Sequence, residues 1–236
     1  MPRPQPLVLL PPSEGKAPDG EGPPWAAGMM VDHDLDRHRR LVLTAAVRAG
    51  VVVRRAPTAP AMDRYTGVLY KELAWPSLSL AARRRGATQV RIVSGLWGLV
   101  APADPIPCYR LKMGAALGEL GRLSTWWKPR LAPLLATRTA GATVWDLLPL
   151  EHQAAMDWTA CEPAERITVR FVDAQDRTVT HWNKLLKGSL VRWLLTVQPR
   201  HVAELAAFEH PLGYRFDPDA TSHVGPRTAV VLRQQP

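Results

Sequence analysis

The stretch LVLLPPSEGK, residues 7–16, passes from four apolar residues through two prolines into a short polar segment. Four successive apolar residues are typical of a strand buried on both faces, and neither Pro11 nor Pro12 can donate the N–H that a sheet ladder requires. The sequence therefore predicts a central strand over residues 7–10 that ends at Pro11. The following residues leave the carboxyl end of this strand, where open α/β sheets tend to bind ligands.

The polar segment SEGK, residues 13–16, does not form a phosphate-binding P-loop. The pattern G-x-x-x-x-G-K-[ST] is met only by the Gly-Lys pair, because Leu10 stands in place of the first glycine and Ala17 in place of the hydroxyl residue. Two interpretations stay open. In one, Lys16 presents its charge to an anion and Glu14 accepts or delivers a proton. In the other, the segment is a solvated polar turn.

The composition is that of a globular chain with excess positive charge. Its 236 residues are 46% hydrophobic, enough to bury a core, and no apolar run reaches the roughly 20 residues of a transmembrane helix. Because the pattern of a signal peptide is absent too, we expect a cytoplasmic protein that does not associate with membranes. Lysine and arginine total 30 against 21 acidic residues, a net charge of +9, which favours phosphate-bearing partners.

The expected elements mix strands and helices along the whole chain. Strands are expected over residues 7–10, 89–94, 143–147, 166–173 (in a hairpin with 178–182) and 228–232. Helices are expected over 34–49, 117–137 (with a break at Pro129) and 184–197. Shorter segments at 62–75 and 77–85 are expected to be helical or turns. The proline-rich residues 101–109 predict an ordered irregular loop. Since no linker divides the chain, we expect a single compact α/β domain over residues 1–236, with a mixed central sheet and surrounding helices.

Aromatic and basic residues are paired at two places, Arg64 with Tyr65 and Tyr109 with Arg110. Each pair can stack on a base and hold a phosphate at once. Alternatively, each tyrosine hydroxyl anchors a loop while its arginine pairs with a nearby aspartate. Asp104, which is flanked by prolines, is either an orienting acid for Arg110 or a catalytic base.

The segment 184–197 predicts a largely buried helix with a basic side. Its apolar residues recur at helical spacing and form a core stripe, while Lys184, Lys187 and Arg192 lie broadly opposite. These cations either contact phosphate or face solvent. Gly188 permits the close approach of another backbone, from protein or from phosphate.

The sequence predicts neither a metal site nor a cofactor. Cys108 and Cys161 form no C-x-x-C pattern and are too few for a disulfide framework. His152 and His181 lack the spacing of metal ligands, so both are expected to be structural histidines.

Five stretches, taken in order, resemble the YaaA family of peroxide-stress proteins. They are LVLLPPSEGK (7–16), RYTGVLY (64–70), SGLWGLVAPADPIPCYRLKMG (94–114), VWDLLPLEH (144–152) and HWNKLLKGSLVRWLL (181–195). Their number and order support the resemblance, since no stretch is specific alone. The better-known branch of the family reads S-P-A-K-T in the opening loop, where this chain has PSEGK, so only Lys16 carries over.

The resemblance implies a compact α/β domain whose basic cleft contains a helix-hairpin-helix-like element, DNA binding, and a role in limiting iron-dependent damage during oxidative stress. We expect the cleft to bind DNA through backbone contacts, with these candidate ligands: Lys16, Arg64, Tyr65, Tyr109, Arg110, Lys112, Lys184, Lys187 and Arg192. The alternative is an enzyme acting on a nucleotide-like or phosphorylated small molecule in the same cleft. Its candidate catalytic residues, for acid/base or nucleophilic chemistry, are Lys16, Glu14 and Asp104.

Overall fold

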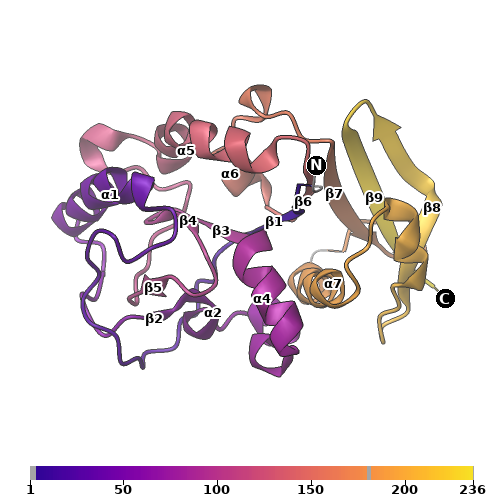
Figure 1. Cartoon of the computed structure of the whole chain (residues 1–236), viewed down its shortest axis with the longest axis horizontal. Coiled ribbons are helices and arrows are strands. Elements are labelled where there is room, and N and C mark those ends of the chain that lie inside the picture. Colours follow the sequence, from indigo (N-terminus) through magenta and orange to yellow (C-terminus); the bar gives the residue numbers. More distant parts are fainter. Residues whose placement is uncertain (1–3, 180–181, 236) are drawn as a thin grey trace.

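The structure, a computed structural model, describes residues 4–179 and 182–235 and is built on a seven-stranded sheet (Figure 1). In spatial order its strands are β4 (Gly98–Val100), β3 (Val90–Ser94), β1 (Leu7–Leu10), β6 (Thr143–Asp146), β7 (Glu165–Val172), β9 (Arg227–Gln234) and β8 (Tyr214–Val224). A separate pair joins β2 (Ala59–Pro60) to β5 (Pro105–Ile106). The edge strands β4 and β8 run antiparallel to their neighbours and the strands between them are parallel. The predicted mixed α/β fold is confirmed.

β1 lies inside the sheet, and all its side chains are buried, as its apolar run predicts. Val8 lies opposite Val90 of β3 on one side and opposite Trp145 of β6 on the other, both in parallel pairing. The chain leaves β1 to form β3 and later crosses back to form β6. The winding direction therefore reverses between β1 and β6, and such a switch point leaves a crevice at the carboxyl ends of the two strands.

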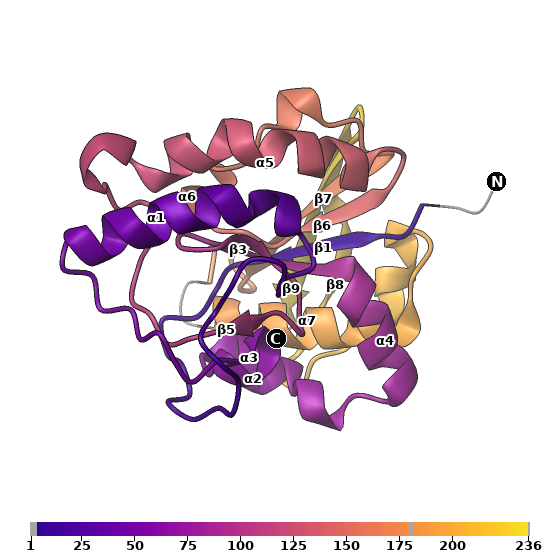
Figure 2. The same ribbon diagram turned by 60° about the vertical axis from the view of Figure 1, so that its left-hand side comes forward.

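Helices cover both faces of the sheet (Figure 2). α1 (Asp36–Arg48) and α5 (Leu123–Thr139) lie on one face, and α3 (Val68–Leu73), α4 (Leu80–Gln89) and α7 (Asn183–Val197) lie on the other. Shorter segments are α2 (Ala61–Arg64), α6 (Leu150–Gln153) and the 3-10 turns η1 (His33–Leu35), η2 (Trp75–Ser77), η3 (Gly118–Leu120), η4 (Trp158–Ala160) and η5 (Val202–Ala207). The segment 62–75, expected to be helical or a turn, contains two short helices, α2 and α3, joined by residues 65–67.

α7 and α3 cross at close range through Gly188. A Cβ at this position would lie 2.8 Å from the Cβ of Glu72 and would collide with the carbonyl oxygen of Leu69. The backbone that approaches Gly188 therefore belongs to α3, which decides between the protein and phosphate interpretations.

α5 is continuous, so the predicted break at Pro129 is wrong. The helix runs through both Pro129 and Pro133 and begins only at Leu123, after the η3 turn. Trp127 and Leu131 are fully buried on the inner side of the helix. Each internal proline costs about 3 kcal/mol in an isolated helix, and we attribute the continuity of α5 to this burial, which offsets that cost.

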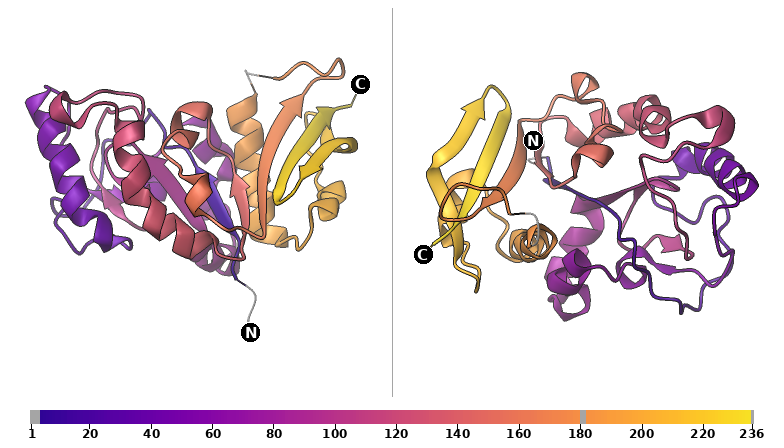
Figure 3. Two further views of the ribbon diagram at one scale, coloured as in Figure 1. Left: turned by 90° about the horizontal axis from the view of Figure 1, so that it is seen from above. Right: turned by 180° about the vertical axis from the view of Figure 1, so that it is seen from behind.

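The last two strands form a hairpin at one end of the sheet, farthest from α1 (Figure 3). The sequence did not predict β8, because its residues are mostly exposed and do not alternate between apolar and polar. Pro218 and a register shift between Asp217 and Ser222 are features that an edge strand tolerates.

Among the described residues, the predicted hairpin of residues 166–173 with 178–182 is formed next to its turn. Val172 bridges Thr178, and the Val179 N–H donates to the carbonyl oxygen of Phe171 at 2.9 Å. The long-range partners of β7 are instead β6 and β9. Residues 180–181, which include the predicted structural histidine His181, lie outside the described residues.

Candidate functional site

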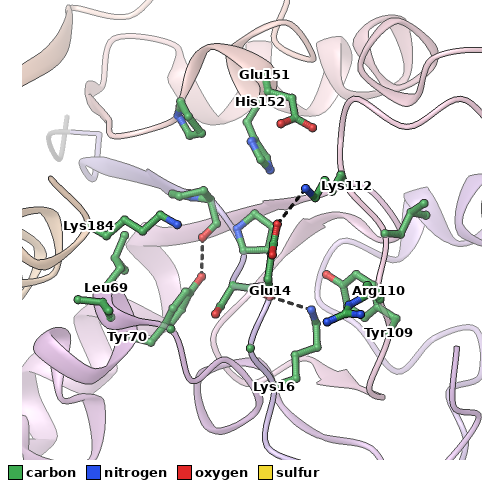
Figure 4. A pocket seen from close by; sticks show the side chains of 18 residues that line it. Glu14, Lys16, Leu69, Tyr70, Tyr109, Arg110, Lys112, Glu151, His152 and Lys184 are labelled. Carbon is green, nitrogen blue, oxygen red and sulfur yellow. Dashed lines mark hydrogen bonds and ion pairs between the residues drawn. The ribbon is translucent and has the colours of Figure 1, made fainter. Parts of the chain in front are cut away.

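A pocket of about 750 Å³ opens at the carboxyl ends of β1 and β6, at the switch point of the sheet (Figure 4). It is lined by residues 11–16, 67–70 and 109–112, together with Pro149, Glu151, His152 and Lys184. The segment expected to leave the central strand thus forms one wall, and the start of α3 forms another. The volume is typical of a site for a small ligand.

The SEGK segment is a turn held by backbone contacts. An isolated antiparallel bridge and two backbone hydrogen bonds join residues 15–17 to residues 64–66. Gly67 packs so closely on this turn that a Cβ there would collide with the Ser13 hydroxyl. The turn is therefore fixed against the α2–α3 connection, and its lysine is presented from a rigid support.

Lys16 reaches into the pocket without an acidic partner. Its ammonium nitrogen donates to the carbonyl oxygen of Ser13 at 2.7 Å and lies 4.1 Å from the centre of the Tyr109 ring and 5.4 Å from that of Tyr65. Among residues 4–179 and 182–235 no carboxylate forms an ion pair with it, since Glu14 pairs with Lys112 instead. Burial lowers the pKa of Lys16 to about 8, so part of the amine is neutral near physiological pH.

Three tyrosines beside Lys16 are buried and hydrogen-bonded. The hydroxyl of Tyr109 lies 2.7 Å from that of Tyr65 and 2.7 Å from Ser94 Oγ, and Tyr70 donates to the carbonyl oxygen of Pro11 at 2.8 Å. Burial raises the pKa of Tyr109 to about 12 and that of Tyr65 well above its usual value. With only 2% of Tyr65 and 5% of Tyr109 exposed, the expected stacking of a base has almost no ring surface to use. The loop-anchoring alternative fits both residues.

Arg64 is fully buried, and its hydrogen bonds go to protein carbonyls and to the Cys108 sulfur. Its guanidinium donates to Ile106 at 3.1 Å, to Asp19 and Pro57 at 2.8 Å each, and to Ala17. These bonds tie two loops, at residues 17–19 and at Pro57, and the strand β5 to α2. No donor of this side chain faces solvent, so the phosphate contact expected for Arg64 has no support in this arrangement.

Asp104 is also an internal anchor. Its carboxylate accepts the Ala101 N–H at 2.7 Å and the Val31 N–H at 2.8 Å. Burial raises the pKa of this carboxyl, while the two backbone donors lower it. Asp104 does not line the pocket, which removes the geometric basis for a catalytic role and for orienting Arg110.

Three exposed cations stand on the pocket walls, namely Arg110, Lys112 and Lys184. Lys112 pairs with Glu14 at 3.3 Å, and their side chains are 69% and 73% exposed. This pair lowers the pKa of the Glu14 carboxyl. Exposed pairs of this kind stabilise a fold by less than about 1 kcal/mol, so Lys112 is free to exchange its partner for a ligand anion.

The other two predicted cations lie outside the pocket. Lys187 donates to the carbonyl oxygen of Leu147 at 2.8 Å, below the end of β6. Arg192 donates to the carbonyl oxygens of Leu73 at 3.1 Å and Ala74 at 3.2 Å, which caps the carboxyl end of α3. Both side chains are thus committed to protein contacts.

Glu151 and His152 line the pocket but were not among the predicted site residues. Glu151 accepts the backbone N–H of Gly114, which fastens α6 to the long loop. The imidazole of His152 points into the pocket (Figure 4), is only 9% exposed, and has no hydrogen-bond partner on either nitrogen among the described residues. Burial lowers its pKa, which favours the neutral ring. Their position just after a buried apolar strand is the signal that could have identified them.

Within residues 4–179 and 182–235, no group of three His, Cys, Asp or Glu side chains is arranged to hold a metal ion. Both cysteines are free thiols. None of the helices in this part of the chain has the length and apolar character needed to cross a membrane.

A sequence profile described as peroxide stress protein YaaA matches residues 26–220, most of the chain. This chain belongs to the YaaA family. A UPF0246 protein of Streptomyces coelicolor is 36% identical over 246 aligned positions, which cover 93% of this chain and 95% of the relative. UPF0246 proteins of Corynebacterium efficiens and Porphyromonas gingivalis are 32% and 30% identical, covering 80% and 70% of this chain and 85% and 67% of their own. The resemblance carried by the five sequence stretches is confirmed.

Proposed function

We propose that this YaaA-family protein binds DNA through the basic residues around the switch-point pocket and so helps to limit oxidative, iron-dependent damage. The observation that supports this is the gathering of Lys16, Arg110, Lys112 and Lys184 from three distant segments around one opening. The net charge of +9 also favours binding to the negatively charged DNA backbone. Neutralising phosphates releases condensed counterions, which is the main source of sequence-independent affinity.

The cations divide into two groups by depth. Arg110, Lys112 and Lys184 are exposed and suit contacts with a backbone that crosses the mouth of the pocket. Lys16 is partly buried and is reached only by a group that enters. A pocket of about 750 Å³ admits a unit of nucleotide size and not a duplex. The duplex therefore lies over the rim in this proposal, without entering.

The same pocket supports a second candidate function, an enzyme that acts on a nucleotide-like or phosphorylated small molecule. Two observations favour it. Lys16 has a pKa of about 8, and the buried imidazole of His152 has no partner among the described residues. Groups with perturbed pKa values inside a cavity are a common feature of active sites. Glu14, beside Lys16 at the mouth, is the carboxylate left for proton transfer.

Fluorescence anisotropy with a labelled duplex, titrated with salt from about 50 to about 200 mM, tests DNA binding. We expect the wild type to bind with a steep salt dependence. The triple variant Arg110→Ala, Lys112→Ala, Lys184→Ala should lose affinity, and its log-log slope should be shallower by about 0.9 for each phosphate contact removed. Lys71→Ala, an exposed lysine of α3 that does not line the pocket, is the control and should bind like the wild type.

Two results would contradict DNA binding at this pocket: no binding by the folded wild type, or equal affinities for wild type and triple variant. Thermal unfolding with a panel of phosphorylated metabolites would then test the small-molecule candidate. The protective role has its own assay, in which plasmid nicking by ferrous iron and peroxide is measured with wild type and triple variant. Protection that is lost only in the triple variant supports a role exerted on bound DNA.

A further inference from the structure

We propose that Lys16 is an amine nucleophile that forms a Schiff base with the open-chain aldehyde of a phosphorylated deoxyribose, the group left in DNA where a base has been lost. This inference rests on the proposed DNA binding for the source of the sugar. A free deoxyribose phosphate presents the same aldehyde, and the experiment below separates the two sources. The inference is supported by the surroundings of Lys16 and by the positions of Tyr109, His152 and the cations at the rim.

The surroundings of Lys16 favour the neutral amine that nucleophilic attack requires. The nitrogen is held by one hydrogen bond, to Ser13, and the face of the Tyr109 ring covers it at 4.1 Å. It forms no ion pair with any described carboxylate. Cys108 and Glu14 nearby favour its charged form, whereas Arg110 and Arg64 disfavour it. Burial, the larger effect, lowers the pKa of Lys16 to about 8.

The other lysines lack this combination of features. The chain has six lysines, of which Lys112 and Lys184 line the pocket but are exposed. Burial also lowers the pKa of Lys187, but its nitrogen is bound to the Leu147 carbonyl outside the pocket. Lys16 is therefore the lysine placed to react with a group that enters.

The walls of the pocket match a base-free sugar phosphate. Leu69, Tyr70 and Pro11 offer apolar surface to the carbon chain of the sugar, and Arg110 and Lys112 stand at the mouth for the flanking phosphates. With no base attached, the unit is smaller than a nucleotide and can enter deeply enough to reach Lys16. An intact nucleotide, whose sugar is closed and has no aldehyde, offers nothing for the amine to attack.

The reaction balances with groups already present. The lone pair of Lys16 Nζ attacks the aldehyde carbon, and the carbonyl oxygen becomes a hydroxyl as it takes up a proton. Loss of this hydroxyl as water, carrying both hydrogens that leave the amine, forms the C=N bond. The neutral imidazole of His152, which has no hydrogen-bond partner among the described residues, lies on the wall opposite Lys16 (Figure 4), and we assign it the relay of these protons.

Reductive trapping tests the inference. The wild type is incubated with cyanoborohydride and a labelled duplex that carries one abasic site, and peptide mass mapping locates any adduct. A duplex with a tetrahydrofuran analogue, which lacks the aldehyde, is the substrate control. We expect a covalent adduct on Lys16 with the abasic duplex alone. Lys16→Arg, which keeps a positive charge but removes the amine nucleophile, should lose at least nine-tenths of the adduct, whereas Lys71→Arg should trap like the wild type.

Parallel anisotropy and trapping of free deoxyribose 5-phosphate separate the possible failures. If the wild type binds DNA but no adduct forms, or the adduct maps to another lysine, the Schiff-base inference is overturned and the DNA-binding proposal stands. If the wild type does not bind DNA but free sugar phosphate is trapped on Lys16, the lysine chemistry stands and the DNA proposal falls. Absence of both binding and trapping overturns both. Because the adduct is located on the wild-type protein, this test does not depend on whether any variant folds.

Discussion

The ammonium nitrogen of Lys16 lies 4.1 Å from the centre of the Tyr109 ring, and the Tyr109 hydroxyl is fixed 2.7 Å from Ser94 Oγ. This contact joins the loop after β1 to the long loop after β4 and holds the lysine inside a pocket. The ring face stabilises the charge by roughly 0.5 to 2 kcal/mol, while burial acts against it. Burying the Lys16 ammonium therefore lowers the free energy of unfolding, and this loss can be measured.

We expect Lys16→Met to raise the free energy of unfolding at pH 7 by about 1 kcal/mol, because an apolar side chain of similar length replaces a desolvated ammonium. The pKa of Lys16 is about 8 when folded, against an ordinary 10.5. The unfolded state therefore binds more protons between these values, and wild-type stability rises with pH there. The advantage of the variant is full below pH 8 and shrinks towards pH 10.5.

Urea unfolding at pH 7 and again near pH 9.5 measures this difference. The exposed Lys71→Met is the control and should change stability by less than about 0.5 kcal/mol. If Lys16→Met is less stable than the wild type at pH 7, the ammonium contributes more through the tyrosine rings than it loses by burial.

His152 predicts a loss of stability in acid. Burial holds its pKa below the ordinary 6.5, so the unfolded state takes up the proton first and stability falls as pH drops below 6.5. His152→Leu removes this titrating group and two ring nitrogens that have no partner among the described residues, so we expect about 1 kcal/mol more stability at pH 7.5 and a larger gain near pH 5.5. Thermal unfolding at both pH values, with exposed His33→Gln as control, measures it. A gain that does not grow in acid would contradict the assignment.

Two arginines that look alike in the sequence should behave differently. Arg64→Met leaves several buried carbonyls without a donor and should lower the free energy of unfolding by about 3 kcal/mol or more. Arg110→Met alters an exposed side chain and should change stability by less than about 0.5 kcal/mol while weakening DNA binding. Denaturant melts and anisotropy on both variants check this. Equal stabilities would show that the buried network around Arg64 is not formed.

Gly188→Ala tests the crossing of α7 and α3. The new methyl group would press on the Glu72 side chain and the Leu69 carbonyl, so we expect a loss of about 1 to 3 kcal/mol although alanine favours helices. Thr196→Ala, on an exposed turn of the same helix, is the control. An unchanged or higher melting temperature for Gly188→Ala would mean that the two helices can separate at little cost.

The central strands could be predicted because each is marked by a short pattern of neighbouring residues in the sequence. Leu7–Leu10 is an apolar run that ends at two prolines, and its exit was correctly expected at the carboxyl end of a central strand. β8 and the unbroken α5 were not predictable in this way. The polar face of β8 depends on its place at the sheet edge, and the prolines of α5 are tolerated in a helix whose inner face is buried.

In the site, too, the sequence located some residues, whereas only the fold determined what they contact. Local pattern located Lys16, Arg110, Lys112 and Lys184 on loops and at the start of a helix, and the fold gathers them around one pocket. It could not reveal that Arg64 is buried among carbonyls from two loops and the strand β5. The sequence gives the charge of a side chain directly. Its hydrogen-bond partners often come from segments tens of residues away, so they depend on the tertiary structure.

Composition and local order were thus sufficient for the fold class, the strand that leads to the pocket and the family. Tertiary structure alone decided which polar groups face a ligand and which face the protein. The reason is physical: burial and hydrogen bonding, which set the pKa of Lys16 and leave His152 unpartnered among the described residues, depend on surfaces that meet only when distant segments pack together.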